Sequence, residues 1–133
     1  MIGMRRHHGI PESFGALVQE QQARWVIRDN DYNKLEWFED YPPPTLEQVL
    51  AKQAELEAAE PLRVVREIRD WYLQQCDWTQ GADIRALRGT EWCTAWDTYR
   101  QQLRDITTTQ TGFYFDEMNH IQGVTWPTRP PTN

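Results

Sequence analysis

The stretch that decides the fold runs from Arg69 to Gln80 and reads Arg-Asp-Trp-Tyr-Leu-Gln-Gln-Cys-Asp-Trp-Thr-Gln. Its first half, with the apolar run Trp71–Leu73, continues an apolar stripe that recurs at helical spacing from Leu62 onward. Asp77 is expected to end this helix, and Gly81 is expected to turn the chain away from it. The sequence therefore predicts a helix that ends in a polar and aromatic corner.

A second aromatic helix is predicted downstream of that corner. Thr90 is a suitable N-cap, and Glu91 is well placed against the helix dipole. Large side chains then recur at intervals of four, three, four and three residues, which is typical of one buried helix face: Trp92, Trp96, Tyr99, Leu103 and Ile106. The run Thr107–Thr109 is expected to stop the helix, because β-branched residues are poor helix formers.

The two helices are expected to form an antiparallel helical hairpin, with Asp77, Trp78 and Thr79 at its corner. Trp78 is predicted to close one end of the core. Asp77 or Thr79 is predicted to satisfy exposed backbone amides near the turn. An arginine of the second helix is expected to form a charge-assisted bond to Asp77. A structural role is therefore predicted for this aspartate.

The helix that leads into the corner is expected to begin after Thr45, with Gln48 completing a weak capping box. Pro61 interrupts the helical pattern, and it either kinks one long helix or starts a second helix stacked on the first. Both alternatives remain open from the sequence. The same apolar stripe also permits chains to pair as a bundle, so self-association is a possible further interaction.

The N-terminal third is predicted to contain an arm, a β-hairpin and a linker. Residues 1–22 are broken by glycine and proline, and they indicate an arm. Ala23–Asp40 is typical of a hairpin, because Asp29–Asn33 offers turn residues between two alternating runs. Tyr41–Pro44 is expected to be a stiff polyproline linker. We accordingly expect an N-terminal region of residues 1–44 and a helical domain of residues 45–133.

The C-terminal third is expected to be largely irregular. Ala82–Gly89 is predicted to be a connection anchored by Ile84 and Leu87. Gly112–Asn119 indicates either a short strand or a loop anchored by its rings. Val124–Pro127 is expected to be extended, because a residue before proline avoids the helical region. The predicted fold class is therefore α+β, mainly α, in which Trp126 with Pro127 either packs on the helical hairpin or docks into another subunit.

Composition excludes several classes of partner. The net charge of −6 argues against a nucleic-acid surface and against an anionic membrane surface. Seven Trp, five Tyr and four Phe residues predict a thin core of large rings, with other rings left for a partner. The longest apolar runs are too short for a membrane span, and residues 1–9 lack the apolar region of a signal peptide.

Catalytic, cofactor and metal chemistry find no support in the sequence. Cys76 and Cys93 form no CxxC pattern, and they indicate free thiols. His120 lies near acidic residues but without the spacing of a metal site. No glycine-rich phosphate loop and no nucleophile elbow occur. We expect no enzyme activity, no cofactor and no metal.

Four blocks of the chain match a known family in their order and spacing. They are Arg69–Leu73, Cys76–Gln80, Trp96 with Tyr99–Ile106, and Val124–Pro127. Together they resemble the C-terminal module of bacteriophage tail assembly chaperones and tail-fibre assembly proteins, in which an R-D-x-L-L helix leads into D-W-T-Q and the module closes on W-P. The resemblance covers about residues 61–130. The chain departs from the pattern at Trp71 and Tyr72 and in a longer, ring-rich segment at 107–122.

The resemblance implies a helper of tail assembly and not a catalyst. It implies a phage tail-fibre protein as the partner, with baseplate proteins as further candidates, in the cytoplasm of the infected host. The alternative is a permanent structural component of the virion tail, at the fibre or baseplate; a bacterial regulator or toxin–antitoxin partner is a third hypothesis. Ring-rich patches are typical binding hot spots, so the candidate partner-binding residues are Trp25, Trp37, Phe38, Phe113, Tyr114 and Phe115.

Overall fold

The computed structural model describes residues 2–133 and is mainly helical, with two small antiparallel sheets. This agrees with the predicted α+β, mainly α, fold class. The chain divides into two compact units: residues 6–60 form one, and residues 61–133 together with the residues up to Arg5 form the other. The boundary that the sequence predicted after Pro44 lies inside the first of these units.

The first helix of the unit of residues 6–60 is α1 (Ile10–Val18), so the arm predicted over residues 1–22 was wrong where it covers this helix. Pro11 lies in the first turn of α1, where its missing N–H costs nothing. Gly15, taken as a break, lets the helix approach Trp25: a Cβ at this position would lie 3.2 Å from the indole ring. Phe14 is fully buried under the hairpin that follows.

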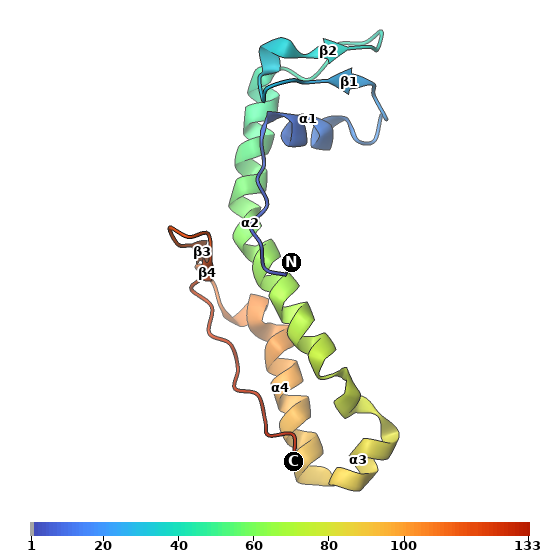
Figure 1. Cartoon of the computed structure of the whole chain (residues 1–133), viewed down its shortest axis with the longest axis vertical. Helices are drawn as coiled ribbons and strands as arrows, with labels where there is room; N and C mark the ends of the chain where they lie inside the picture. The colour runs from blue at the N-terminus through green and yellow to red at the C-terminus, as the bar shows by residue number, and fades with distance from the viewer. Residues whose placement is uncertain (1) are drawn as a thin grey trace. The chain divides into compact units, whose positions relative to one another are not determined.

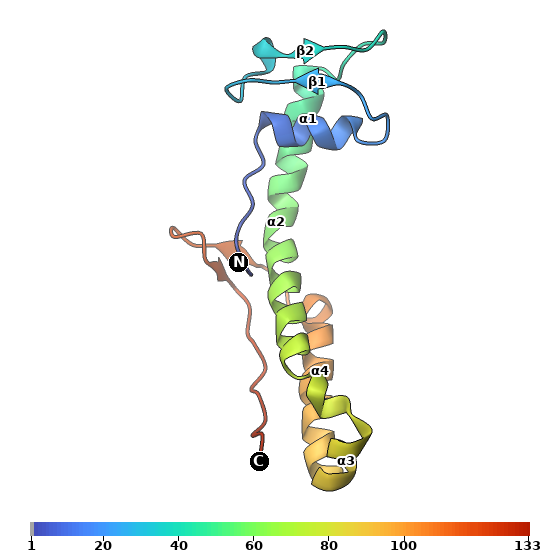
Figure 2. The ribbon, with the colours of Figure 1, turned by 45° about the vertical axis from the view of Figure 1, so that its right-hand side comes forward.

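That hairpin pairs β1 (Trp25–Val26) with β2 (Glu36–Trp37), as the sequence predicted. Its connection contains the 3₁₀ helix η1 (Tyr32–Lys34), which Asp31 caps by accepting a hydrogen bond from the Asn33 amide. Trp25 lies opposite Trp37 in the register. Figures 1 and 2 show α1 lying against this ribbon.

Helix α2 (Leu46–Gln75) begins with the predicted capping box. The Thr45 amide donates to Gln48 Oε1 at 2.9 Å, and the Gln48 amide donates to Thr45 Oγ1 at 3.2 Å. Pro61 lies inside a single helix, so the alternative of a second helix that starts at Pro61 is wrong. The division between the compact units also falls at Pro61, where the proline removes one backbone hydrogen bond from the helix.

The predicted polyproline linker is tied to the hairpin of its own unit. The Tyr32 hydroxyl donates to the Pro44 carbonyl, and Trp37 Nε1 donates to the Tyr41 carbonyl. Arg6 and His8 are similarly fixed within residues 6–60, because both hydrogen-bond the buried Glu60 carboxylate. Residues 6–60 are therefore a packed unit, and Tyr41–Pro44 is not a free spacer.

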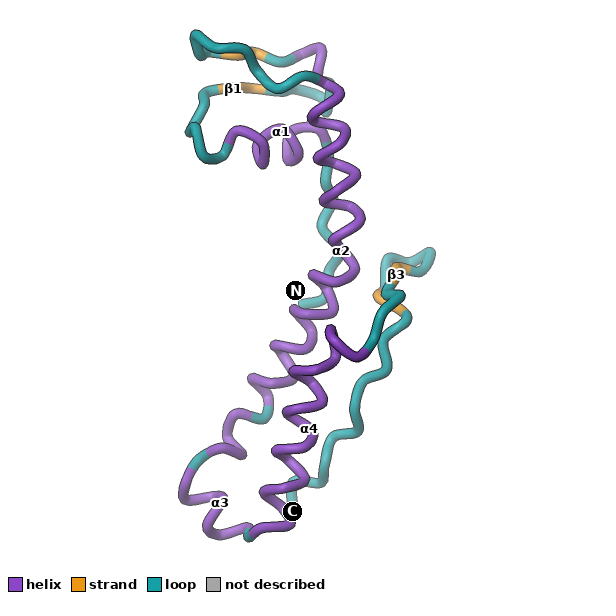
Figure 3. Tube along the Cα trace, turned by 180° about the vertical axis from the view of Figure 1, so that it is seen from behind, coloured by secondary structure: helices purple, strands orange, loops and turns teal. Residues whose placement is uncertain are grey.

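In the other unit, α2 ends at Gln75 and the 3₁₀ helix η2 (Asp77–Gln80) follows, close to the predicted helix end. The predicted connection over residues 82–89 is instead helix α3 (Ala82–Arg88). Leu87 does not anchor it, since this side chain is 79% exposed. Helix α4 (Thr90–Thr109) then runs antiparallel to the second half of α2 (Figure 3). The predicted helical hairpin is thus present, with a helical corner.

Both ends of α4 differ from the prediction. Its N-cap is Gly89, whose φ of +85° suits glycine, and Thr90 makes no side-chain cap. The helix continues through the threonines expected to stop it. The hydroxyls of Thr108 and Thr109 donate to the Asp105 carbonyl, which gives these polar groups a partner inside the helix.

A second hairpin, β3 (Tyr114–Phe115) with β4 (Ile121–Gln122), follows α4. Of the two alternatives for Gly112–Asn119, a short strand or a loop, the strand is therefore present. The Asp116 carboxylate closes its turn by accepting from the amides of Met118 and His120. The chain ends in the C-terminal segment (Val124–Asn133), which is extended as predicted and has no regular secondary structure. Within the same unit, the Gly3 amide donates to Glu67 of α2.

Candidate partner-binding surface

Arg100 joins the end of α2 to α4. Its Nη1 donates to the Leu73 carbonyl at 3.0 Å and to Cys76 Sγ at 3.1 Å, and it lies 3.0 Å from Asp77 Oδ1. The Arg100 side chain is 9% exposed, whereas that of Asp77 is 64% exposed. The predicted charge-assisted bond from the second helix to Asp77 is therefore present. Arg100 Nε is buried without a hydrogen-bond partner.

The other corner residues have roles that differ from the prediction. Thr79 is buried, and its hydroxyl donates to the Cys76 carbonyl at 2.7 Å and accepts from the Gln80 side-chain amide at 3.0 Å, not from a backbone amide. No side-chain cap is formed at the start of η2, so the expected capping by Asp77 or Thr79 was wrong. Trp78 is 43% exposed, and its ring lies 5.8 Å from that of the buried Trp96. It covers one end of the ring cluster while keeping an exposed edge.

The ring cluster fills the space between α2, α4 and the C-terminal segment. Its buried members are Cys76, Trp96, Tyr99 and Leu103, and Trp126 packs against them. The centre of the Trp126 ring lies 5.1 Å from that of the Tyr72 ring, and the two ring planes make an angle of 64°. Aromatic pairs prefer such an edge-to-face arrangement. Trp126, with Pro127 half-buried beside it, therefore packs back on the helical hairpin of its own chain.

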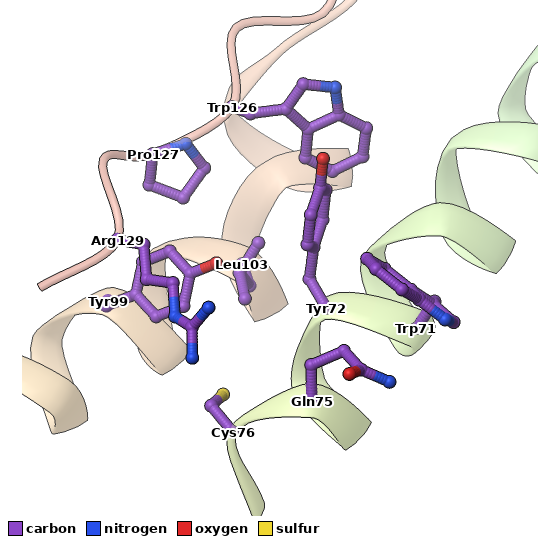
Figure 4. A pocket seen from close by; sticks show the side chains of 9 residues that line it. All are labelled: Trp71, Tyr72, Gln75, Cys76, Tyr99, Leu103, Trp126, Pro127 and Arg129. Carbon is purple, nitrogen blue, oxygen red and sulfur yellow. The ribbon is translucent and has the colours of Figure 1, made fainter. Parts of the chain in front are cut away.

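A pocket of about 330 Å³ opens beside this cluster, and Figure 4 shows the residues that line it. Trp71 and Tyr72 come from α2, Leu103 from α4, and Trp126 with Pro127 from the C-terminal segment. The pocket thus has mainly apolar walls from three separate stretches of the chain. Such walls with a few polar groups are typical of binding sites.

The polar side of the pocket is formed by Tyr99, Gln75 and Arg129. Burial raises the pKa of the Tyr99 phenol above its ordinary value. The Arg129 guanidinium lies 5.4 Å from the centre of the Trp96 ring, a cation–π distance. Sequence reasoning missed Arg129, because it is one cation in a proline-rich segment; its position three residues after Trp126 is the signal that could have found it.

The α3–α4 corner is held by an ion pair that the sequence analysis missed. Arg85 donates from Nη1 and Nη2 to the two carboxylate oxygens of Asp97, at 2.9 and 2.8 Å. These hydrogen bonds hold the pKa of Asp97 below its usual value. Cys93, a free thiol like Cys76, lies close by and contacts the Arg85 carbonyl.

The candidate rings of the first hairpin divide between core and surface. Trp25 and Trp37 are half-buried and pack against Phe14, at ring distances of 4.8 and 5.9 Å. Phe38 is 53% exposed. Of these three predicted interface residues, Phe38 offers the freest apolar surface.

The candidate rings of the second hairpin are also placed differently from one another. Phe113 and Phe115 are half-buried, and Arg5 lies over the Phe115 ring at 4.8 Å. Tyr114 is 57% exposed, and Met118 at the turn is 76% exposed. The hairpin therefore holds one face against its own unit and presents apolar side chains on the other.

Within residues 2–133 no group of three or more His, Cys, Asp or Glu side chains is placed to hold a metal ion. In the same part of the chain, no helix has both the length and the apolar character of a membrane span. The features that the structure brings together are apolar pockets and exposed rings, which are suited to binding a protein.

The comparison with protein families gives a match to the model described as Phage tail assembly chaperone protein, over residues 62–131. The matched region begins inside α2 at the start of the second compact unit and includes the ring cluster and the pocket. No curated protein and no solved structure matches the chain.

Proposed function

Because the chain belongs to the phage tail assembly chaperone protein family, we propose that it binds the tail-fibre protein of its phage and promotes fibre assembly or attachment. The family implies a partner in the phage tail and a role without catalysis. That this partner is the tail fibre, with baseplate proteins as further candidates, is our proposal beyond what the family implies. We place this binding in the host cytoplasm, where fibre chains are made before tails are complete.

One observation carries the proposal: the family-matched region leaves several large apolar side chains in solvent although its own core is small. They are Trp71, Trp78, Leu87, Tyr114 and Met118, with exposed fractions from 38 to 79%. Exposed apolar groups of this size favour a protein interface. An assembly chaperone needs such groups, because newly made fibre chains expose apolar surface until they associate.

Co-expression tests the proposal. The tagged full chain is produced with the tail-fibre protein of the same phage, and the soluble and co-purified fibre is quantified. We expect the chain to raise the soluble fraction and to be captured with the fibre. A fibre protein that is neither captured nor made more soluble by the chain would overturn the proposal.

Two variants locate the surface. The double variant Tyr114→Thr with Met118→Ser removes apolar area from the second hairpin, and we expect capture to fall about tenfold, as hot-spot energies imply. Phe38→Ser tests the first hairpin in the same way. Leu50→Gln is the matched control, because Leu50 is 45% exposed but lies in the first half of α2, before the family-matched region begins.

Quantifying the chain in purified phage particles decides whether it leaves the tail before assembly is complete. Few or no copies fit a chaperone that acts before assembly is complete. Near-stoichiometric copies would show instead that it remains as a structural component of the fibre or baseplate.

A further inference from the structure

The pocket between α2, α4 and the C-terminal segment has a local charge opposite to that of the chain. The sequence carries 20 acidic and 14 basic side chains, yet among the described residues only one charged side chain lines the pocket, that of Arg129. No ion pair formed within residues 2–133 involves Arg129. Its guanidinium rests over Trp96 and points into the pocket in Figure 4. The site thus presents an unneutralised cation beside apolar walls.

The C-terminal segment that forms one wall has free backbone groups. It is tied to α4 at Thr125, whose amide donates to Gln110 Oε1 and whose carbonyl accepts from Gln110 Nε2, both at 2.8 Å. Beyond that tie, Trp126–Asn133 forms no hydrogen bond to any described part of the chain. Pro127, Pro130 and Pro131 have no N–H, so the segment offers its carbonyls and its non-proline amides for pairing with another extended chain.

The size of the pocket limits what enters it. At about 330 Å³ it lies near the lower end of the volumes found for binding pockets, roughly 300–1,000 Å³. It therefore accepts one large side chain and a neighbouring polar group. Tyr72 and Trp126 already form an edge-to-face pair at its wall, which favours a further aromatic ring.

We propose that this pocket binds an extended segment of the partner tail protein in which an aromatic side chain lies next to a carboxylate. The ring enters between Tyr72, Leu103 and Trp126. The carboxylate pairs with Arg129, and the backbone runs beside Trp126–Arg129. The identity of the partner rests on the proposed function, whereas the chemistry of the segment rests on the pocket.

Peptide titration tests the pocket alone. Acetylated and amidated Gly-Phe-Asp-Gly is added to the ¹⁵N-labelled full chain and compared with Gly-Phe-Asn-Gly, which has the same shape without the charge. The indole N–H signals are assigned by Trp→Phe substitution. We expect the acidic peptide to shift the signals of Trp71 and Trp126. The indoles of Trp25 and Trp37, in the other unit, are internal references.

The Arg129→Gln variant tests the charge. We expect it to weaken the binding of the acidic peptide about fivefold, which corresponds to the loss of an exposed ion pair of about 1 kcal/mol. The affinity for the neutral peptide should not change. Arg104→Gln is the matched control, because Arg104 is exposed on α4 and does not line the pocket. Retained dispersion of the indole signals shows that each variant is folded.

Three results of the peptide titration itself would overturn the inference. They are equal binding of the two peptides, shifts that miss both Trp71 and Trp126, and no shift at any tryptophan. N-acetylphenylalanine bound as tightly as the peptide would also overturn it, since a small acid uses no backbone pairing.

The fibre capture assay keeps this inference separate from the proposed function. Capture that is unchanged by Arg129→Glu would reject the pocket as the binding site and leave the chaperone role standing. Failure of the unaltered chain to capture fibre would reject the fibre as partner. The peptide titration would still test whether the pocket binds an aromatic side chain next to a carboxylate.

Discussion

Truncating Trp96 tests most directly how α4 packs. The side chain is fully buried, and three rings surround it at centroid distances of 5.7 to 6.0 Å: Trp78, Trp92 and Tyr99. Replacing a buried Trp by Ala costs about 3–5 kcal/mol, which includes the cavity left behind. Trp96 Nε1 is buried without a partner, so its removal recovers part of about 1–3 kcal/mol. We expect Trp96→Ala to lower the free energy of unfolding by about 3 kcal/mol.

Urea unfolding of the full chain, followed by far-ultraviolet circular dichroism, measures this loss without depending on the deleted fluorophore. The two compact units can unfold separately, so the transition that moves identifies the unit that holds Trp96. Trp96→Phe keeps a ring and removes the unpaired N–H, and we expect it to cost about 1 kcal/mol or less. Trp71→Ala is the control on α2, because Trp71 is 38% exposed.

A loss below about 0.5 kcal/mol for Trp96→Ala would place this ring at the surface. A loss equal to that of Trp71→Ala would mean the same. Either result would refute the helical face of α4 from which the ring cluster and the pocket are built.

The other predictions concern polar contacts. Asp77→Ala is expected to destabilise more than Arg100→Met in urea unfolding, because it leaves a buried cation facing only neutral acceptors, whereas Arg100→Met leaves an exposed carboxylate. Thr45→Ala is expected to cost about 1 kcal/mol through loss of the capping box, measured in the same assay. Arg85 lowers the folded-state pKa of Asp97, so their pair stabilises above the unfolded pKa of about 3.9 and that stability is lost as pH falls through the folded-state pKa. An acid titration of stability should therefore be less steep for Asp97→Asn.

The aromatic stripe of α4 was predictable because its signal is strong. Rings at intervals of four and three leave one helical face that can hold them, and Trp96, Tyr99 and Leu103 are all buried there. The contact from α4 to Asp77 followed from the same geometry, since arginines flank the stripe. Large residues at helical spacing thus predicted both the packing and its main polar contact.

Residues that resemble helix breakers in the sequence are tolerated where a contact compensates for them, either with another element, as at Gly15, or within the helix, as at Thr108 and Thr109. Gly15 looked like an interruption but permits α1 to approach Trp25. Thr108 and Thr109 looked like a stop, yet their hydroxyls bond back to Asp105. In both cases the deciding contact involves a partner that composition and propensity do not reveal.

The pocket was beyond prediction for a different reason. Its walls come from residues 71–76, 99–103 and 126–129, and it exists only because the C-terminal segment lies along α4. Spacing within a helix predicts a face, but it does not predict how an extended segment crosses that face. For Trp126 the sequence left open whether it packs on the helical hairpin or docks into another subunit, and Arg129, three residues later, was given no role.

Trp126 links the stability of this unit to what the pocket accepts. Its ring covers Tyr72 and the cluster beneath, while the hydrogen bonds that hold the backbone around it within residues 2–133 are those of Thr125 to Gln110. Any ligand that moved this segment outward would expose apolar ring surface, at about 25 cal/mol for each Å². A purely polar ligand offers nothing to offset that cost. An aromatic side chain does, because it covers the same rings from the other side, and this favours an aromatic group next to the carboxylate that pairs with Arg129.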